Sequence, residues 1–192
     1  LDIIVLQVAI TGIIALGVTQ VIILGGIDLS SGSVVGATAM IVMSFAQTEL
    51  VNGNPNPKAI FGAWAMDLPV IVPIAVGLAC GLAAGLINGL LVAYTKIPPF
   101  IATLGMMVSA RGVAKWWSNG QPVSFPTGSY GSLANGDILG TLTFGLVSWP
   151  GQNPAVVFAV LALLFQIAMI RTLYGKRCYA IGSNEAAARM SG

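Results

Sequence analysis

The sequence predicts an all-α, polytopic transmembrane helical bundle with about five spans. Hydrophobic residues make up 56% of the chain and charged residues 7%, whereas a soluble domain carries roughly 25% charged residues. Apolar runs of about 20 residues match the ~30 Å hydrocarbon core as helices, and the ~10-residue alternating segments of a membrane β-barrel are not seen. The formal net charge of +2 is too weak and scattered for nucleic-acid binding.

The first two spans are expected at residues 3–24 and 29–47. The first is an almost continuous apolar run. The apolar run at 34–47 is too short to cross alone, but a helix beginning near Leu29 would reach about 19 residues, or ~28 Å. The segment 48–68 is rich in Asn, Pro and Gly and is therefore expected to be an extramembrane loop.

The third and fourth spans are expected at 69–95 and 97–117. Lys96, Pro98 and Pro99 end the third helix, and the prolines suit the first turn of the fourth, where no amide donor is needed. Small residues let helices approach closely in lipid, which predicts a helix-packing face rather than a ligand site for a glycine row at i+4 spacing. The row consists of Gly77, Gly81, Gly85 and Gly89.

The region 118–153 is polar and turn-rich, and its modestly apolar middle at 138–149 is expected to be a surface or re-entrant element. The last span is expected at 154–170. The tail 171–192 is basic and should be cytoplasmic under the positive-inside rule. Arg111 and Lys115 would then lie toward the outer side, beside Trp116, and snorkel to the surface.

The segment "GGIDLSSGS" at 25–33 places a carboxylate and hydroxyls between two apolar runs. An unpaired Asp28 at the bilayer centre would cost about 2.5–3.5 kcal/mol. In one interpretation Asp28, Ser30 or Ser31 caps the next helix after a turn at Gly25 and Gly26. In a second, compatible interpretation a broken helix exposes polar groups to a translocation path.

Further polar residues within the spans are candidates for that path, although interhelical hydrogen bonds would explain them equally well. The complete set of path or helix-break candidates is Asp28, Ser30, Ser31, Ser33, Gln20, Asn88 and Thr103.

The tail contains a Gly182-Ser183-Asn184 break followed by strong helix formers that begin with Glu185. This pattern predicts a short amphipathic helix, and composition alone leaves a solvated loop as the alternative. No phosphate-binding loop, His-based acid/base pair or Ser/His/Asp set is present, so the sequence predicts neither enzymatic activity nor a cofactor. Without His, and with Cys80 and Cys178 far apart in the chain, a metal site is not expected.

Three ordered blocks at 15–36, 85–124 and 174–192 together resemble the monosaccharide-type permease subunit of bacterial ABC importers, most closely the galactose/methyl-galactoside type. Residues 25–33 match the family pattern G-G-I-D-L-S-x-G-S, whereas Ser183 stands where the family usually has Gly. The resemblance implies that residues 1–192 are the middle part of a roughly ten-span permease.

The resemblance also implies location in the bacterial inner membrane and import of a simple sugar. The implied partners are a second permease subunit, as a homodimer, a cytoplasmic ATP-binding subunit and a periplasmic or lipid-anchored sugar-binding protein. The segment 171–192 matches the family's ATPase-coupling region, with candidate residues Gly182, Asn184, Glu185, Ala187, Ala188, Ser191 and Gly192.

A secondary transporter or channel for a small polar solute is the competing function. It should carry ion-coupling carboxylates within its spans or a charged pore ring, and Asp28 alone supports that weakly. A membrane scaffold that transports nothing is a third possibility.

Overall fold

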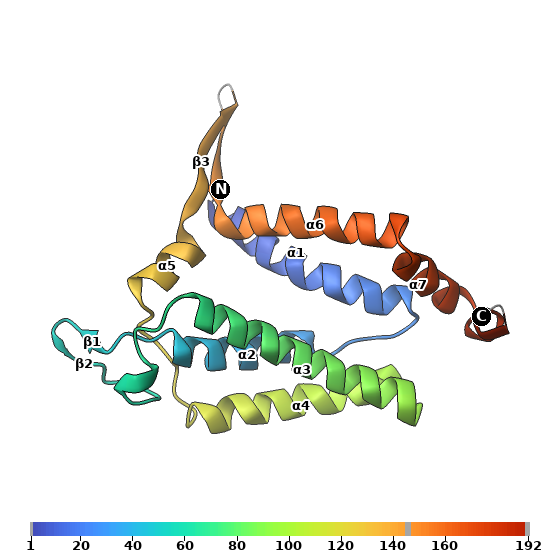
Figure 1. The fold of residues 1–192 in the computed structure, drawn as a ribbon, viewed down its shortest axis with the longest axis horizontal. Coiled ribbons are helices and arrows are strands. Elements are labelled where there is room, and N and C mark those ends of the chain that lie inside the picture. Colours follow the sequence, from blue (N-terminus) through green and yellow to red (C-terminus); the bar gives the residue numbers. More distant parts are fainter. Residues whose placement is uncertain (1, 145–146, 191–192) are drawn as a thin grey trace. The chain divides into compact units, whose positions relative to one another are not determined.

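The computed structural model describes residues 2–144 and 147–190, and helices dominate it (Figure 1). The chain divides into two compact units, one of residues 28–132 and the other of residues 1–27 with 133–192. In the described part of the chain, 3 helices are long and apolar enough to cross a membrane, at Ile3–Ile23, Ile71–Thr95 and Asn153–Arg171. The all-α membrane architecture expected from composition is therefore confirmed.

The unit that contains both ends of the chain is built on two parallel helices, α1 (Asp2–Ile23) and α6 (Asn153–Arg171). They lie alongside one another in Figure 1 and meet at Gly12, where an added Cβ would lie 2.6 Å from the Phe158 ring. After α6 come α7 (Leu173–Ser183) and α8 (Glu185–Met190). Before α6 stands an antiparallel hairpin of β3 (Asp137–Phe144) and β4 (Val147–Gln152).

The other unit is a three-helix bundle of α2 (Ser31–Phe45), α3 (Ile71–Thr95) and α4 (Pro99–Trp117). Helix α3 runs antiparallel to α2, since Gly77 faces Val42 while Asn88 bonds to Ser30. Helix α4 runs parallel to α2, because Trp117 Nε1 near its end donates to Ser44 Oγ at 3.0 Å. As expected, Pro98 and Pro99 occupy the start of α4, and α5 (Gly128–Asn135) leads from this unit into the other.

The loop between α2 and α3 forms outside the long helices, as predicted, and contains β1 (Leu50–Val51), β2 (Asn54–Pro55) and the 3-10 turn η1 (Ala63–Ala65). Gln47 is completely buried beneath it. Its Nε2 donates to the carbonyls of Lys58 and Ser124 at 2.8 and 2.9 Å, and its Oε1 accepts from the Ile60 amide at 3.0 Å. Satisfied polar atoms make such burial tolerable, so one side chain fixes the loop to the bundle.

Helix α2 is shorter than expected, with 15 residues instead of about 19, or ~22 Å at 1.5 Å per residue. Its start is delayed because the Asp28 side chain accepts from the Ser30 amide at 2.7 Å, which holds Leu29 and Ser30 in a turn. Its end is set by Gln47, whose side chain is committed to the loop.

The structure defines two further segments more closely than the sequence did. The apolar middle of 118–153, expected to be a surface or re-entrant element, forms the antiparallel β3–β4 hairpin. The expected Gly182-Ser183-Asn184 break is present only at Asn184, which separates α7 from α8, whereas Gly182 and Ser183 belong to α7.

Candidate functional site

The turn that ends α1 is closed by two glycines. The Gly25 amide donates to Ile22 O and the Gly26 amide to Val21 O, both at 2.9 Å. Gly25 has φ +81°, the left-handed conformation that favours glycine in this C-terminal motif. The expected turn at Gly25 and Gly26 is thereby confirmed.

Asp28 folds back onto Ser30 directly after this turn. Its Oδ1 accepts from the Ser30 amide at 2.7 Å and from Ser30 Oγ at 2.6 Å. Ser30 occupies the N-cap position of α2 but makes no side-chain cap bond itself. The Asp28 carboxylate therefore lies next to the positive end of the α2 dipole, a favourable place for negative charge.

The same turn is bonded to the two neighbouring helices. Asn88 Nδ2 of α3 donates to Ser30 Oγ at 3.1 Å, and the Leu29 amide donates to Thr103 Oγ1 of α4 at 3.3 Å. Ser30 and Thr103 are buried. The structure thus brings together four of the candidates proposed from sequence, Asp28, Ser30, Asn88 and Thr103, which we call the break cluster.

Hydrogen-bond direction within the break cluster leaves one acceptor unused. A carboxylate only accepts, so the single Ser30 hydroxyl proton goes to Asp28, and Asn88 must meet Ser30 through its donor nitrogen. Among the described residues, Asn88 Oδ1 is buried and has no hydrogen-bond partner. Such an atom costs about 1–3 kcal/mol, so the cluster has an acceptor available for a donor from outside these residues.

Within the described residues, the remaining path candidates form no side-chain hydrogen bond to the break cluster. Ser31 begins α2, and the described residues show no side-chain hydrogen bond for it. Ser33 Oγ accepts from Arg111 Nε at 3.0 Å, so Arg111 reaches back along α4 to the first turn of α2. The sequence prediction placed Arg111 toward the outer surface. A charged residue within an expected span usually has a partner or a function, and this rule could have predicted a bonded Arg111.

Gln20 belongs to the other unit, where its Oε1 accepts from the Tyr174 hydroxyl of α7 at 2.9 Å. Tyr174 is half-exposed; its partial burial, and then the adjacent Cys178, raise the pKa of the phenol. No sequence pattern predicted this pair, because it joins residues 154 positions apart.

Two glycines of α7 pack directly on backbone. An added Cβ at Gly175 would overlap the carbonyl of Met169 in α6, and one at Gly182 would overlap the carbonyl of Ile23 at the end of α1. Cys178 lies between them and is buried, with 4% of its surface exposed. Helix α7 is therefore fixed to the last turn of α1, immediately before the Gly25–Gly26 turn.

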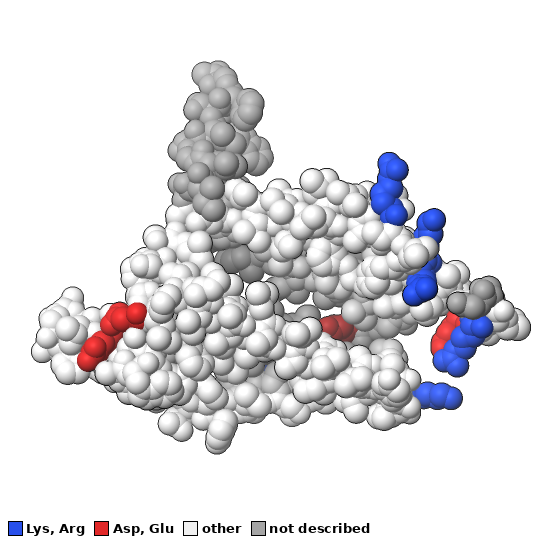
Figure 2. All heavy atoms as spheres, viewed as in Figure 1, with Lys and Arg blue, Asp and Glu red and all other residues white. Residues whose placement is uncertain are grey.

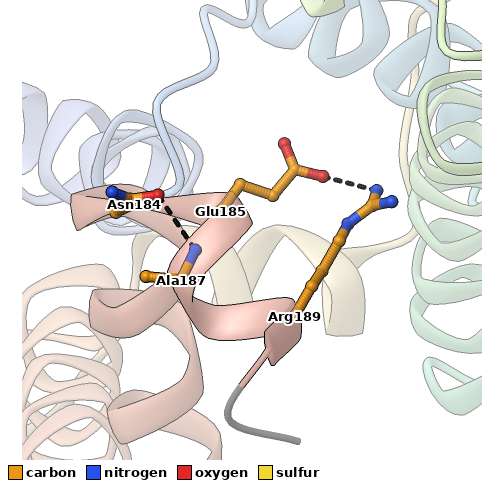
Figure 3. Close-up of polar contacts among 4 residues, drawn as sticks. All are labelled: Asn184, Glu185, Ala187 and Arg189. Carbon is orange, nitrogen blue, oxygen red and sulfur yellow. Dashed lines mark hydrogen bonds and ion pairs between the residues drawn. The ribbon is translucent and has the colours of Figure 1, made fainter.

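The predicted tail helix forms as α8 (Figure 3). Asn184 caps it, since its Oδ1 accepts from the Ala187 amide at 3.0 Å, and Glu185 pairs with Arg189 at 2.6 Å. Ala187 and Ala188 both belong to α8, whereas Ser191 and Gly192 lie outside the described residues. The pair is exposed on both sides and contributes about 0.3–0.5 kcal/mol at most.

The glycine row meets a neighbour at its first member. A Cβ at Gly77 would lie 3.1 Å from Val42 Cγ2 of α2. At Gly81, Gly85 and Gly89 it would find no described atom within 4 Å. Close packing along the whole row stays a prediction.

The arrangement offers hydrogen-bonding groups rather than reactive ones. Among the described residues no group of three or more His, Cys, Asp or Glu side chains is placed to hold a metal ion. The break cluster combines a carboxylate, hydroxyls and an amide, which are suited to binding and positioning a polar group.

Comparison with known proteins places the chain among transport proteins. Residues 1–192 match the family model described as branched-chain amino acid transport system / permease component. The chain is 32% identical over 189 residues to the ribose import permease protein RbsC of Bacillus subtilis, covering 97% of this chain and 50% of the relative. It is 33% identical over 183 residues to the galactose/methyl galactoside import permease protein MglC of Haemophilus influenzae, covering 94% and 51%.

The chain thus spans about half the length of the curated relatives it matches. These identities differ too little to separate the two sugars. No solved structure matches the chain.

Proposed function

The chain belongs to this family of transport-system permease components, and on that premise we propose that it forms part of the transmembrane subunit of an ABC importer for a simple sugar. The observation that carries the proposal is its similarity to ribose and galactose import permeases over nearly its whole length. ATP hydrolysis would take place on a separate cytoplasmic subunit. The protein is a multi-pass membrane protein, and the bacterial inner membrane is its proposed location.

The proposed spans are 3–24, 29–47, 69–95, 97–117 and 154–170, with helix bounds as in the structure. Helices α2 and α4 are the less apolar or shorter members of this set. Polar groups on the two helices bond to each other, Arg111 to Ser33 and Trp117 to Ser44, which supports their crossing as a pair because each satisfies the other in lipid.

The break cluster is proposed to lie beside the sugar's path. A sugar is uncharged and rich in hydroxyl donors, and the unused Asn88 Oδ1 is an acceptor. Asn88 Oδ1 is buried in this conformation, so the helices would have to shift before a solute hydroxyl could reach this atom. This requirement is compatible with a transporter that alternates between two states.

The tail is proposed to receive the ATPase. Helix α8 is exposed, and α7 connects it to the end of α1 through Gly182 and Ile23. A displacement of α8 by the ATPase would therefore reach the Gly25–Gly26 turn and the segment that carries Asp28. The proposed importer also contains a second permease copy in the membrane. A sugar-binding protein on the side of the membrane opposite the ATPase completes it.

Growth tests this function. The full-length protein, expressed with its partner ATPase and sugar-binding protein, should restore growth on ribose or galactose to a strain that lacks its own permeases for that sugar. The ATPase with its catalytic glutamate replaced should abolish the rescue. Growth that persists without a working ATPase would instead favour the secondary transporter.

A further inference from the structure

Helices α7 and α8 line an open groove of about 730 Å³. The α7 wall contains Leu173, Lys176, Arg177 and Ile181, whose spacing places them on one helical face. The α8 wall contributes Glu185 and Arg189. The groove therefore combines apolar side chains with cations, and Figure 2 shows Lys and Arg side chains gathered over these two helices.

The charge of the groove is positive and partly uncompensated. Glu185 is paired with Arg189 at 2.6 Å. Within the described residues, Lys176 and Arg177 form no ion pair. Lys176 and Arg177 could therefore bind an anionic group.

The position of α7 indicates the source of that anion. Only Thr172 separates α7 from the end of the apolar helix α6, and Gly182 at the other end of α7 packs on Ile23 at the end of the apolar helix α1. Because α1 and α6 are parallel, both ends lie at the same side of the membrane. Helix α7 thus runs across the ends of two spans, at the depth of lipid headgroups.

We infer that the α7–α8 groove binds the phosphate headgroup of an anionic phospholipid. Lys176 and Arg177 contact the phosphate through charge-assisted hydrogen bonds, and Leu173 and Ile181 contact the glycerol and upper acyl region. An acidic protein segment would satisfy the same cations, but the headgroup depth favours lipid. This site goes beyond sugar import and does not depend on it.

The test is native mass spectrometry of the full chain in neutral detergent, titrated with phosphatidylglycerol or phosphatidylcholine. We expect preferential retention of phosphatidylglycerol. Loss of each cation should weaken it roughly fivefold, so the Lys176→Gln/Arg177→Gln double variant should lose about 25-fold. Lys58→Gln, which removes an exposed charge in the loop between α2 and α3, should bind as the wild type does.

A third variant distinguishes binding in the groove from nonspecific attraction of the lipid to positive charge. Ile181→Ser leaves every charge in place but removes an apolar wall, so it too should weaken phosphatidylglycerol retention. Retention unchanged in Ile181→Ser, or in the double variant, would overturn the proposal, as would equal binding of the two lipids. In a Cys80→Ser background, slow thiol labelling of the buried Cys178 establishes that each variant still carries a docked α7.

Two additions identify the occupant. Glycerol phosphate at millimolar concentration should displace little phosphatidylglycerol, and complete displacement would make this a site for free phosphate. Loss of ATPase capture in the Lys176→Gln/Arg177→Gln variant, with its phosphatidylglycerol retention unchanged, would assign the two cations to a protein surface and overturn the lipid site. Neither sugar nor transport enters the assay, so its failure is distinguishable from failure of the proposed function.

Discussion

Replacing Gly182 by Ala should detach α7 from α1. The new Cβ would overlap the backbone carbonyl of Ile23, an atom that cannot rotate aside. Overpacking of this kind costs about 1–3 kcal/mol. Gly112→Ala is the matched control, because it brings comparable helical propensity in α4 with no atom within 4 Å of its Cβ.

Cys178 reports the detachment, since it lies on α7 and is 4% exposed. In a Cys80→Ser background it becomes the only thiol in the sequence. A loss of about 1–3 kcal/mol in docking raises the open population about 5- to 160-fold, and maleimide labelling should accelerate by the same factor. Gly112→Ala should label at the wild-type rate.

Equal labelling rates in the Gly182→Ala and Gly112→Ala variants would refute the packing of α7 on α1. They would also remove the proposed connection between the tail and the Gly25–Gly26 turn. Fast labelling in the wild type would have the same meaning, because it would show that Cys178 is not buried by docking.

The remaining predictions concern the break cluster and the tail. Ser30→Ala should lower the free energy of unfolding by about 1–3 kcal/mol, because Asp28 and Asn88 each lose a partner; Ser31→Ala, with no such bonds, should melt like the wild type in detergent. In the full-length protein, Asp28→Ala should reduce sugar uptake more than Asp67→Ala, and equal uptake by both variants would contradict a role for the helix break. Glu185→Arg should place like charges together beside Arg189 and reduce co-purification of the ATPase while leaving membrane insertion normal, which a pull-down and membrane fractionation measure together.

The long helices could be predicted because their signal is local. Apolar runs set α1, α3 and α6 to within a few residues, and prolines set the start of α4. The length of α2 could not be predicted in this way. It depends on a turn bonded to α3 and α4 and on the loop that holds Gln47.

Helix α7 was missed for a related reason. Glycine is a poor helix former, so Gly182 next to Ser183 reads as a break in the sequence. In the structure Gly175 and Gly182 are instead the positions where α7 touches backbone, and the contact compensates for low propensity. Only knowledge of the neighbouring helices separates these two meanings of glycine.

The sequence predicted which residues belong to the candidate site but not which of them bond to one another. The hydroxyls and carboxylate of 25–33 marked a polar break, and Asn88 and Thr103 were the polar residues of the following spans. These residues come together only because α2 packs antiparallel to α3 and parallel to α4. The hydrophobic pattern within one span carries no information on how that span packs against the others. The Arg111–Ser33 bond depends on that same packing.

Transport in liposomes is the most direct measurement of the central claim. The full-length permease, reconstituted with its ATPase and with the sugar-binding protein outside, should accumulate labelled ribose or galactose when ATP is enclosed on the ATPase side. Uptake should stop without ATP and be indifferent to proton and sodium gradients. Accumulation driven by an ion gradient, with the ATPase absent, would contradict the account.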